Sequence, residues 1–334
     1  MPVYLRHPLS FEHDTGGHPE NAGRLRAIET RLDAEDWHGL EVVEAPAASR
    51  DQLLRVHTPA HLESIEAIAA RGGGPIDLDT LMSERSYDAA LRSAGAAVRA
   101  AELVMGEGER FAFCGTRPPG HHAERERAMG FCLFNNVAIA AAHALAELGA
   151  ARVMIADWDV HHGNGTQDVF YDSAEVLFSS IHQSPLYPGT GSPREAGAGD
   201  GAGYTVNLPV PPGAGPDEFL ALVQGVWVPL IDAFEPGLLI LSAGYDAHRA
   251  DPLAECLLDA VAFGDMAASL RDAAERRGIG VIACLEGGYD PAALADSVSA
   301  TIAAFTDPGR PARTAPEESA MPYRERLGDP WALA

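Results

Sequence analysis

Positive charge is scarce in this sequence. Its 24 Lys and Arg face 48 Asp and Glu, which gives a formal net charge of −24 at pH 7. Nucleic acids and anionic membranes require a basic face, so the composition argues against both as partners. An acidic protein would attract a cationic substrate, although a soluble, self-repelling surface accounts for the same charge.

Cysteine and long apolar runs are also scarce. The four cysteines, Cys114, Cys132, Cys256 and Cys284, show no close pairing. We therefore expect reduced thiols and a cytoplasmic protein rather than a disulfide or cysteine-zinc framework. The N-terminus lacks the basic and then apolar order of a signal peptide, and the most apolar long stretch, 226–245, contains two acidic residues and two prolines. We expect neither a signal peptide nor a membrane span.

Short runs rich in β-forming residues alternate with longer runs rich in Ala, Leu and Glu. The expected strands are 111–117, 151–159, 175–182, 237–246 and 279–290. The expected helices are 86–105, 134–149, 217–234, 257–277 and 291–306. This alternation predicts a parallel sheet covered on both faces.

Gly- and Pro-rich segments at 185–203 and 211–216 are expected to be loops rather than domain linkers. Strand-like residues separate them, and the alternation resumes afterwards. We predict a single domain over residues 1–334, in which about 307–334 form a C-terminal surface extension.

Polar side chains follow the expected strands, where functional groups gather in parallel α/β sheets. Asp157, Asp159 and His161 are spaced by two, so they would leave an extended backbone on the same side. Carboxylate and imidazole suit a divalent ion such as zinc, and Asp246 after another strand would complete an open three-ligand site. Each aspartate taken alone is better explained as a helix cap.

Three further side chains suit acid–base chemistry. His121 and His122 are adjacent in a Pro-Gly loop, and imidazoles with a pKa near about 6.5 are natural proton carriers. Tyr289 follows two glycines at a fourth strand end, where a phenol can donate a hydrogen bond to a developing oxyanion. Taken alone, a His pair is more often a surface feature, and a Tyr in a Gly-rich turn is more often structural.

Seven motifs occur in the order of the histone deacetylase superfamily: RPPGHH, GFCLFNN, DWDVHHGNG, SSIH, YPGTG, SAGYDAHRADP and EGGY. The resemblance covers nearly the whole chain, and DWDVHHGNGTQ with EGGY is similar to the class II branch and its bacterial deacetylase-like amidohydrolase relatives. It implies an arginase-deacetylase fold, a three-layer α/β/α domain with a mainly parallel sheet of about eight strands.

The resemblance implies one zinc ion per chain, bound by Asp159, His161 and Asp246. The reaction it implies is hydrolysis of a linear N-acyl amide, most simply acetyl-lysine to lysine and acetate. Ferrous iron could occupy the same ligands, because availability as well as affinity decides which metal is bound.

In the same pattern, His121 and His122 would transfer protons and Tyr289 would polarise the substrate carbonyl. Asp157 would lie behind the site, paired with His121. Asn164 stands where class I relatives have an aspartate. An amide adds no negative charge, so His122 should be less basic than it would be beside a carboxylate.

The resemblance also implies structural potassium. A first ion would be bound by four residues, Asp157, Asp159, His161 and Ser180. A second would take backbone carbonyls around Phe170, Ser173, Val176 and Tyr204.

A narrow substrate channel is implied as well. Phe131 and Tyr187 would form its walls and Gly130 would face the linear stem of the substrate, although Phe131 could equally be a core aromatic. Apolar walls suit a methylene stem, because each CH₂ removed from water contributes about 0.8 kcal/mol. Arg24 aligns with an arginine near an internal acetate exit channel. For His162 we expect a structural role beneath the site.

The motifs leave the choice of substrate open. Polyamine-selective relatives carry an acidic gatekeeper at the position of Leu253, so this chain favours acyl-lysine peptides. Glu255 lies close enough in sequence to keep an acetylpolyamine, a small cationic amide, as the alternative. The motifs also do not decide whether the chain forms homo-oligomers.

Two less favoured alternatives share the fold. A dimanganese arginase-like hydrolase needs more inward carboxylates than residues 157–165 offer. A non-catalytic acyl-lysine binder is disfavoured because Tyr289, which such relatives replace, is present.

Overall fold

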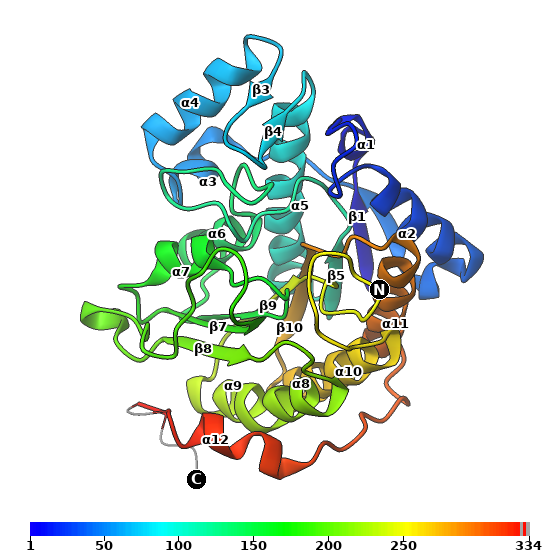
Figure 1. The fold of residues 1–334 in the computed structure, drawn as a ribbon, viewed down its shortest axis with the longest axis vertical. Helices are drawn as coiled ribbons and strands as arrows, with labels where there is room; N and C mark the ends of the chain where they lie inside the picture. The colour runs from blue at the N-terminus through cyan, green and yellow to red at the C-terminus, as the bar shows by residue number, and fades with distance from the viewer. Residues whose placement is uncertain (328–329, 332–334) are drawn as a thin grey trace.

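The centre of the fold is an eight-stranded sheet (Figure 1). The computed structural model describes residues 1–327 and 330–331. The strands are β1 (Val3–Arg6), β2 (Glu41–Glu44), β5 (Phe111–Cys114), β6 (Val153–Asp157), β7 (Val176–Gln183), β8 (Thr205–Val210), β9 (Leu238–Ala243) and β10 (Gly280–Leu285). Their order is β2-β1-β5-β10-β9-β6-β7-β8, and every neighbouring pair is parallel.

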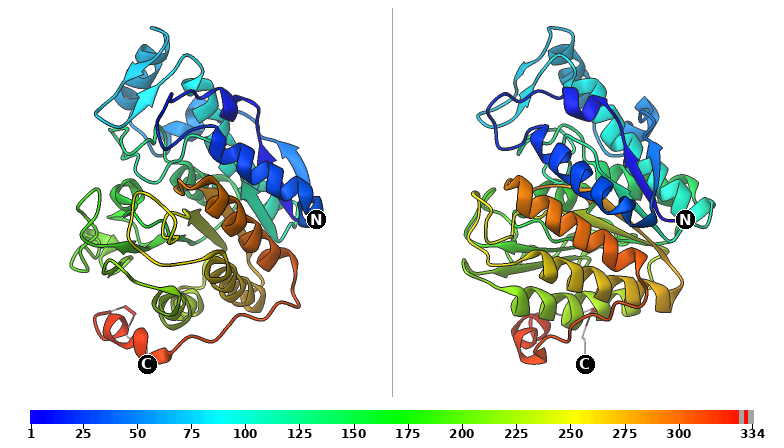
Figure 2. Two further views of the ribbon diagram at one scale, coloured as in Figure 1. Left: turned by 45° about the vertical axis from the view of Figure 1, so that its right-hand side comes forward. Right: turned by 90° about the vertical axis from the view of Figure 1, so that its right-hand side faces the viewer.

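Helices cover both faces of this sheet (Figures 1 and 2). One layer contains α3 (Arg50–Leu54), α4 (Pro59–Ala69), α5 (Ser86–Gly106), α6 (Asn136–Glu147) and α7 (Asn164–Phe170). The other contains α2 (Gly23–Ala34), α8 (Pro216–Leu222), α9 (Val228–Phe234), α10 (Ala260–Arg277) and α11 (Pro291–Thr306). The predicted three-layer α/β/α fold is confirmed.

Several shorter elements connect these helices and strands. They are α1 (Leu9–Glu12), α12 (Met321–Arg324), the 3₁₀ turns η1 (Asp36–Gly39), η2 (Gly199–Gly201) and η4 (Glu317–Ser319), and the antiparallel pair β3 (Gly74–Pro75) and β4 (Leu81–Met82).

Alternate residues of a central strand face opposite helix layers, which explains the near-continuous apolar runs. On β10, Ile282 packs in the cluster with α5 and α6, whereas Val281 and Ala283 pack in the cluster with α10 and α11. All three side chains are at most 2% exposed. A strand buried on both faces has no polar face to alternate with, as expected for a parallel sheet.

The expected helix 217–234 is interrupted. It consists of α8, a π-helical turn η3 (Val223–Trp227) and α9. Pro229 has no backbone N–H to donate to the preceding turn, which accounts for the wider turn before it.

A buried ionic cluster joins the N-terminal loop to the end of β5. The Glu20 carboxylate accepts hydrogen bonds from Arg117 (2.6 Å from Nη2 to Oε2) and from Arg24 (3.1 Å). All three residues are at most 1% exposed. Arg117 also donates to the Ser10 carbonyl at 2.7 Å. Because Arg117 opens the loop that carries His121, this cluster fixes one edge of the site described below.

Replacing Glu20 by Gln should lower the free energy of unfolding by about 3 kcal/mol at pH 7, because it leaves buried guanidinium charge unpaired. Burial alone would raise the pKa of Glu20, but Arg117 and the hydrogen bonds from His13 and Arg117 hold it well below its usual value. A carboxyl group whose pKa is depressed in the folded state stabilises the fold above its unfolded-state pKa of about 4.3. This stabilisation is lost as the pH falls through the folded-state pKa. Urea unfolding should therefore show that the free energy of unfolding lost in Glu20→Gln becomes smaller below about pH 4. A loss that does not depend on pH would contradict the charge argument.

The described part of the C-terminal segment, 307–327 and 330–331, runs along the outer side of α8 and α10 (Figure 2). Gln224 donates to the Arg313 carbonyl at 2.7 Å, and the Tyr323 hydroxyl donates to the Pro209 carbonyl at 3.1 Å. The Trp331 ring packs edge-on against Tyr204, with 5.4 Å between ring centroids. Among the described residues, no helix combines the length and the apolar character needed to cross a membrane.

Candidate active site and metal centre

Four neighbouring strands deliver the predicted site residues to one edge of the sheet. The segments that follow β5, β10, β9 and β6 carry His121, Tyr289, Asp246 and Asp159 respectively. Parallel strands end at the same edge, so residues up to 168 positions apart in sequence meet there.

Asp159, His161 and Asp246 form a compact triad. One potential ligand atom from each lies within 4.8 Å of the other two. His161 Nδ1 is 3.2 Å from Asp159 Oδ1 and 3.0 Å from Asp246 Oδ2. The two aspartates are at most 1% exposed and His161 is 8% exposed.

The expected strand 151–159 ends early, and the extended chain through His161 that strand alternation would require is not present. β6 ends at Asp157. The backbone then turns, because the Asp159 N–H donates to Asp157 Oδ1 (3.1 Å) and the His161 N–H donates to Asp159 Oδ1 (2.9 Å). The carboxylates thus accept the backbone N–H groups of Asp159 and His161, which a continued strand would use to pair with its neighbour. Asp159 and His161 still converge, but through turns rather than through strand alternation.

Two glycines make room for the carboxylates. A Cβ on Gly244 would lie 2.0 Å from Asp159 Oδ2, and one on Gly287 would lie 2.0 Å from Asp246 Oδ2. The Gly287 N–H donates to Asp159 Oδ2 at 2.7 Å, and the Val160 N–H donates to Asp246 Oδ1 at 2.8 Å. The carboxylates are therefore fixed before any ion binds, and the donor set of two carboxylates and one imidazole fits a divalent cation.

The electrostatics of the triad are strongly coupled. Burial lowers the pKa of His161, but its contacts with Asp159 and Asp246 outweigh this and raise it to about 10. Burial and the nearby Asp159 raise the pKa of Asp246. Burial acts in the same direction on Asp159, yet His121 and His161 hold its pKa well below the usual value. Strongly perturbed pKa values in a buried cluster of charged groups are typical of a functional site.

The two histidines of the Pro-Gly loop lie beside the triad and differ in basicity. Their ring centroids are 4.0 Å apart. His121 Nδ1 donates to Asp157 Oδ2 (3.0 Å), and His122 Nδ1 donates to Asn164 Oδ1 (2.7 Å). Although burial opposes it, Asp159 and Asp157 raise the pKa of His121 to about 10, whereas burial and His121 push that of His122 well below its usual value.

Sequence reasoning missed Glu286, although it lies within the quoted EGGY motif. Its buried Oε2 accepts the backbone N–H groups of Gly120 (2.7 Å) and His121 (3.1 Å). Burial raises the pKa of this carboxyl to about 7. Glu286 therefore fixes the backbone on which the histidine pair is mounted. Its only signal in the sequence was its place within that motif, because the contact itself depends on the tertiary pairing of β5 with β10.

Asp251 was missed as well. It is 8% exposed, and its carboxylate accepts the Tyr289 N–H at 2.6 Å and the Leu253 N–H at 2.9 Å. Burial and the nearby Asp246 raise the pKa of Asp251 to about 7. The residue therefore connects the loop after β9 to the loop after β10. Its only signal in the sequence was its place within the quoted SAGYDAHRADP motif.

The Tyr289 ring is packed between two side chains. The Arg24 guanidinium lies 4.9 Å from the ring centroid, and Phe131 contacts it edge-on at 5.9 Å. Arg24 also donates from Nε to the Gly288 carbonyl at 2.6 Å. The structure thus places Arg24 behind the tyrosine loop, on the side of the buried Glu20 cluster.

A cavity of about 250 Å³ leads to the triad. Its lining consists of Asp79, His122, Gly130, Phe131, His161, Leu186, Tyr187, Leu253 and Tyr289. The predicted channel residues Gly130, Phe131 and Tyr187 belong to it, and so does Leu253 at the gatekeeper position. Asp79 and Leu186 were missed, since neither stood in a recognised motif. Glu255 is exposed and donates its backbone N–H to Gln183 instead (2.9 Å).

Gly130 and Phe131 take unusual backbone conformations, with φ of +55° and +69°. A Cβ on Gly130 would lie 2.4 Å from the His122 ring. The absence of a side chain at Gly130 thus keeps the cavity open beside His122.

His162 is buried and holds the loop that carries Tyr187. Its Nδ1 lies 2.8 Å from Thr190 Oγ1, and its Nε2 lies 3.1 Å from Gln167 Oε1. Burial, together with the neighbouring His182, lowers the pKa of His162 to about 3. A neutral histidine that joins the Tyr187 loop to α7 has the contacts expected of a structural role.

The residues predicted to bind potassium fall into two groups behind the triad. Asp157 and Ser180 are directly paired on β6 and β7. In the second group, the Phe170 carbonyl accepts the Ser173 N–H and the Tyr204 carbonyl accepts the Phe178 N–H, both at 3.0 Å. A carbonyl oxygen can accept twice, so these bonds are compatible with cation binding. Potassium stays a prediction at both places.

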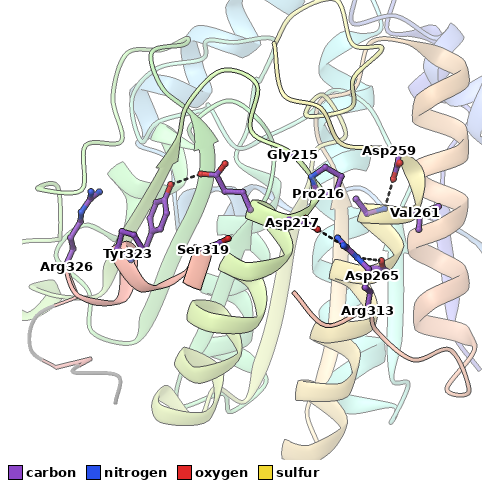
Figure 3. A pocket seen from close by; sticks show the side chains of 13 residues that line it. Gly215, Pro216, Asp217, Asp259, Val261, Asp265, Arg313, Ser319, Tyr323 and Arg326 are labelled. Atoms are coloured by element: carbon purple, nitrogen blue, oxygen red, sulfur yellow. Dashed lines mark hydrogen bonds and ion pairs between the residues drawn. The ribbon is translucent and has the colours of Figure 1, made fainter. Parts of the chain in front are cut away.

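A larger pocket, of about 880 Å³, lies on another side of the molecule between α8, α10 and the C-terminal segment (Figure 3). Arg313 crosses it, paired with Asp217 and 3.6 Å from Asp265. None of the triad, the histidine pair or Tyr289 lines it. The candidate catalytic groups therefore line the smaller cavity, not this pocket.

The chain is similar to several known proteins. The family model for the histone deacetylase domain matches residues 18–305. A probable deacetylase of Methanothermobacter thermautotrophicus is 43% identical over 88% of this chain and 88% of its own length. A histone deacetylase-like amidohydrolase of Pseudomonas aeruginosa is 38% identical over 88% of this chain and 80% of its own. The crystal structure of the HDA15 HD domain is 35% identical, covers 91% of this chain and 90% of its own, and superposes with a TM-score of 0.86.

Proposed function

The chain belongs to the histone deacetylase family, and we propose that it is a zinc-dependent hydrolase that removes acyl groups from lysine side chains. The observation that carries this proposal is the buried Asp159–His161–Asp246 triad at the bottom of a narrow cavity, with a histidine pair and a tyrosine beside it. The apolar residues of the cavity lining, Phe131, Leu186 and Leu253, suit the four methylenes of a lysine side chain.

Zinc would be held by the triad, where it would polarise the amide carbonyl and lower the pKa of a water molecule. Three protein ligands leave a position open for chemistry, as in catalytic zinc sites. Among the described residues, one group of three possible ligands was found, which favours a single ion over an arginase-like pair.

The protein's own groups divide the proton transfers. His122, whose Nδ1 donates to the neutral amide of Asn164, would accept a proton from water. His121, whose Nδ1 donates to the Asp157 carboxylate, would donate a proton to the departing amine. The Tyr289 hydroxyl would donate a hydrogen bond to the oxyanion that develops on the substrate carbonyl.

An acetylpolyamine is the second candidate substrate. Asp79 places a carboxylate in the cavity lining, and the net charge of −24 would attract a polycation. Against it, Leu253 occupies the gatekeeper position in the lining, while Glu255 is exposed. We therefore rank acyl-lysine first.

The test is a comparison of kcat/KM for acetyl-lysine peptides, longer acyl-lysine peptides and acetylpolyamines on protein loaded with a defined metal. We expect the acetyl-lysine peptide to exceed the acetylpolyamine by at least about tenfold, and Leu253→Glu to shift this ratio towards the polyamine by about tenfold, or 1.4 kcal/mol. The chain contains no lysine, so released acyl groups report on the substrate alone. A wild-type preference for the polyamine would reverse the ranking, and no hydrolysis of any acyl amide would refute the proposal.

A further inference from the structure

Two glycines precede Tyr289 and give the backbone there unusual conformational freedom. Gly287 and Gly288 separate the end of β10 from the tyrosine, and Gly288 has φ of +117°. Asp290 then caps α11 by accepting the Ala293 N–H at 2.8 Å. Glycine loses more conformational entropy on ordering than other residues, so an outside contact is needed to hold the tyrosine in one place.

Asp159 and Arg24 hold the two glycines, and Asp251 holds the backbone of Tyr289 itself from a different loop. One carboxylate oxygen accepts the Tyr289 N–H at 2.6 Å, and the other accepts the Leu253 N–H at 2.9 Å. Its own N–H donates to the His248 carbonyl at 2.8 Å, which fixes the loop in turn. Hydrogen bonds to a carboxylate are about twice as strong as neutral ones. The buried Asp251 therefore holds the backbones of two residues that line the cavity, Tyr289 and Leu253.

We propose that Asp251 is the positioning residue of the active site: it holds the Tyr289 hydroxyl at the reacting carbonyl and sets the tyrosine loop against the Leu253 wall. The inference rests on the proposed function, because it concerns the same reaction. Asp251 does not line the cavity and acts only through the residues that do.

Loss of this anchor should act on turnover more than on binding. Displacing a catalytic group by about 1 Å can cost about 10²-fold in rate, whereas the remaining cavity walls stay in place. We expect Asp251→Ala to lower kcat about 30-fold and to change KM less than about threefold. Asp251→Asn keeps one accepting oxygen of the two, so its kcat should lie between those of Asp251→Ala and the wild type.

A double-mutant cycle separates positioning from a general structural role. Wild type, Asp251→Ala, Tyr289→Phe and the double variant are compared on an activated trifluoroacetyl-lysine peptide, so that slow variants remain measurable. If Asp251 acts through the tyrosine hydroxyl, its replacement should cost about 30-fold when Tyr289 is present, but less than about threefold in the Tyr289→Phe background. Equal losses in both backgrounds would overturn the inference.

Controls keep this result interpretable. Asp259 lies in the same loop region and caps α10 by accepting the Ala262 N–H at 3.0 Å, without contacting Tyr289. Asp259→Ala should lose about 1 kcal/mol of stability and keep kcat within about twofold. If Asp251→Ala does not fold, the cycle is run with Asp251→Asn. A wild type without hydrolysis would refute the proposed function, whereas an active wild type with an additive cycle would refute only the role of Asp251.

Discussion

Tyr289→Phe should yield a folded, metal-binding protein whose kcat for acyl-lysine hydrolysis is reduced about 10²- to 10³-fold. The substitution removes one oxygen and leaves the ring, which keeps its contacts with Arg24 and Phe131. The Tyr289 backbone N–H also keeps its bond to Asp251. Only the hydrogen bond to the developing oxyanion is lost. Because that bond strengthens in the transition state, kcat should fall while KM changes little.

Steady-state kinetics with metal analysis on each preparation would measure this effect. The matched control is Tyr187→Phe, which removes a hydroxyl from the wall of the same cavity. The Tyr187 ring contacts His122 edge-on at 5.2 Å, and this contact survives the substitution. We expect the control to keep kcat within about threefold, since its hydroxyl is not assigned to the oxyanion. Turnover like that of the wild type in Tyr289→Phe would remove the tyrosine from the mechanism.

The fold was largely predictable because its signal is local. Residues 153–156 and 238–241 are apolar, flanked by helix-like segments, and buried in the structure. Strand ends were predicted less well. The expected strand 279–290 stops at Leu285, because Glu286 and the two glycines leave the ladder to serve the site. The position of β10 between β5 and β9 depends on long-range pairing, which no local pattern encodes.

The candidate site was predictable to the extent that its residues stand in motifs. Those motifs placed the triad, the histidine pair and Tyr289, and the structure brings all of them to one edge of the sheet. The supporting residues Glu286 and Asp251 were not predicted. Each acts on a backbone N–H from another loop, and such contacts have no characteristic residue type or spacing. Asp79 was missed for a similar reason, since it enters the cavity from the β3–β4 hairpin.

Asp246→Ala should abolish stoichiometric zinc binding and reduce acyl-lysine hydrolysis to background. Removing groups that merely support metal ligands costs about 10- to 100-fold in affinity, so the loss of one of three direct ligands should exceed about 100-fold. The substitution relieves the repulsion between Asp246 and Asp159, but it also removes the acceptor of the Val160 N–H and the partner of His161 Nδ1. The metal-free variant should therefore unfold at a lower temperature than metal-free wild type, because buried polar groups lose their partners.

The sharpest readout is thus the response to metal rather than stability itself. Added zinc should raise the Tm of the wild type, because an ion that binds only the native state stabilises it by mass action, by about 2.7 kcal/mol at a hundredfold excess over Kd. The same zinc should leave the Tm of Asp246→Ala unchanged. Asp217→Asn, an exposed carboxylate in the pocket of Figure 3, serves as the control and should respond like the wild type. If Asp246→Ala still bound one zinc per chain with an undiminished Tm shift, the ion would have to lie away from Asp246, and the Asp157–Ser180 pair would be the first place to look.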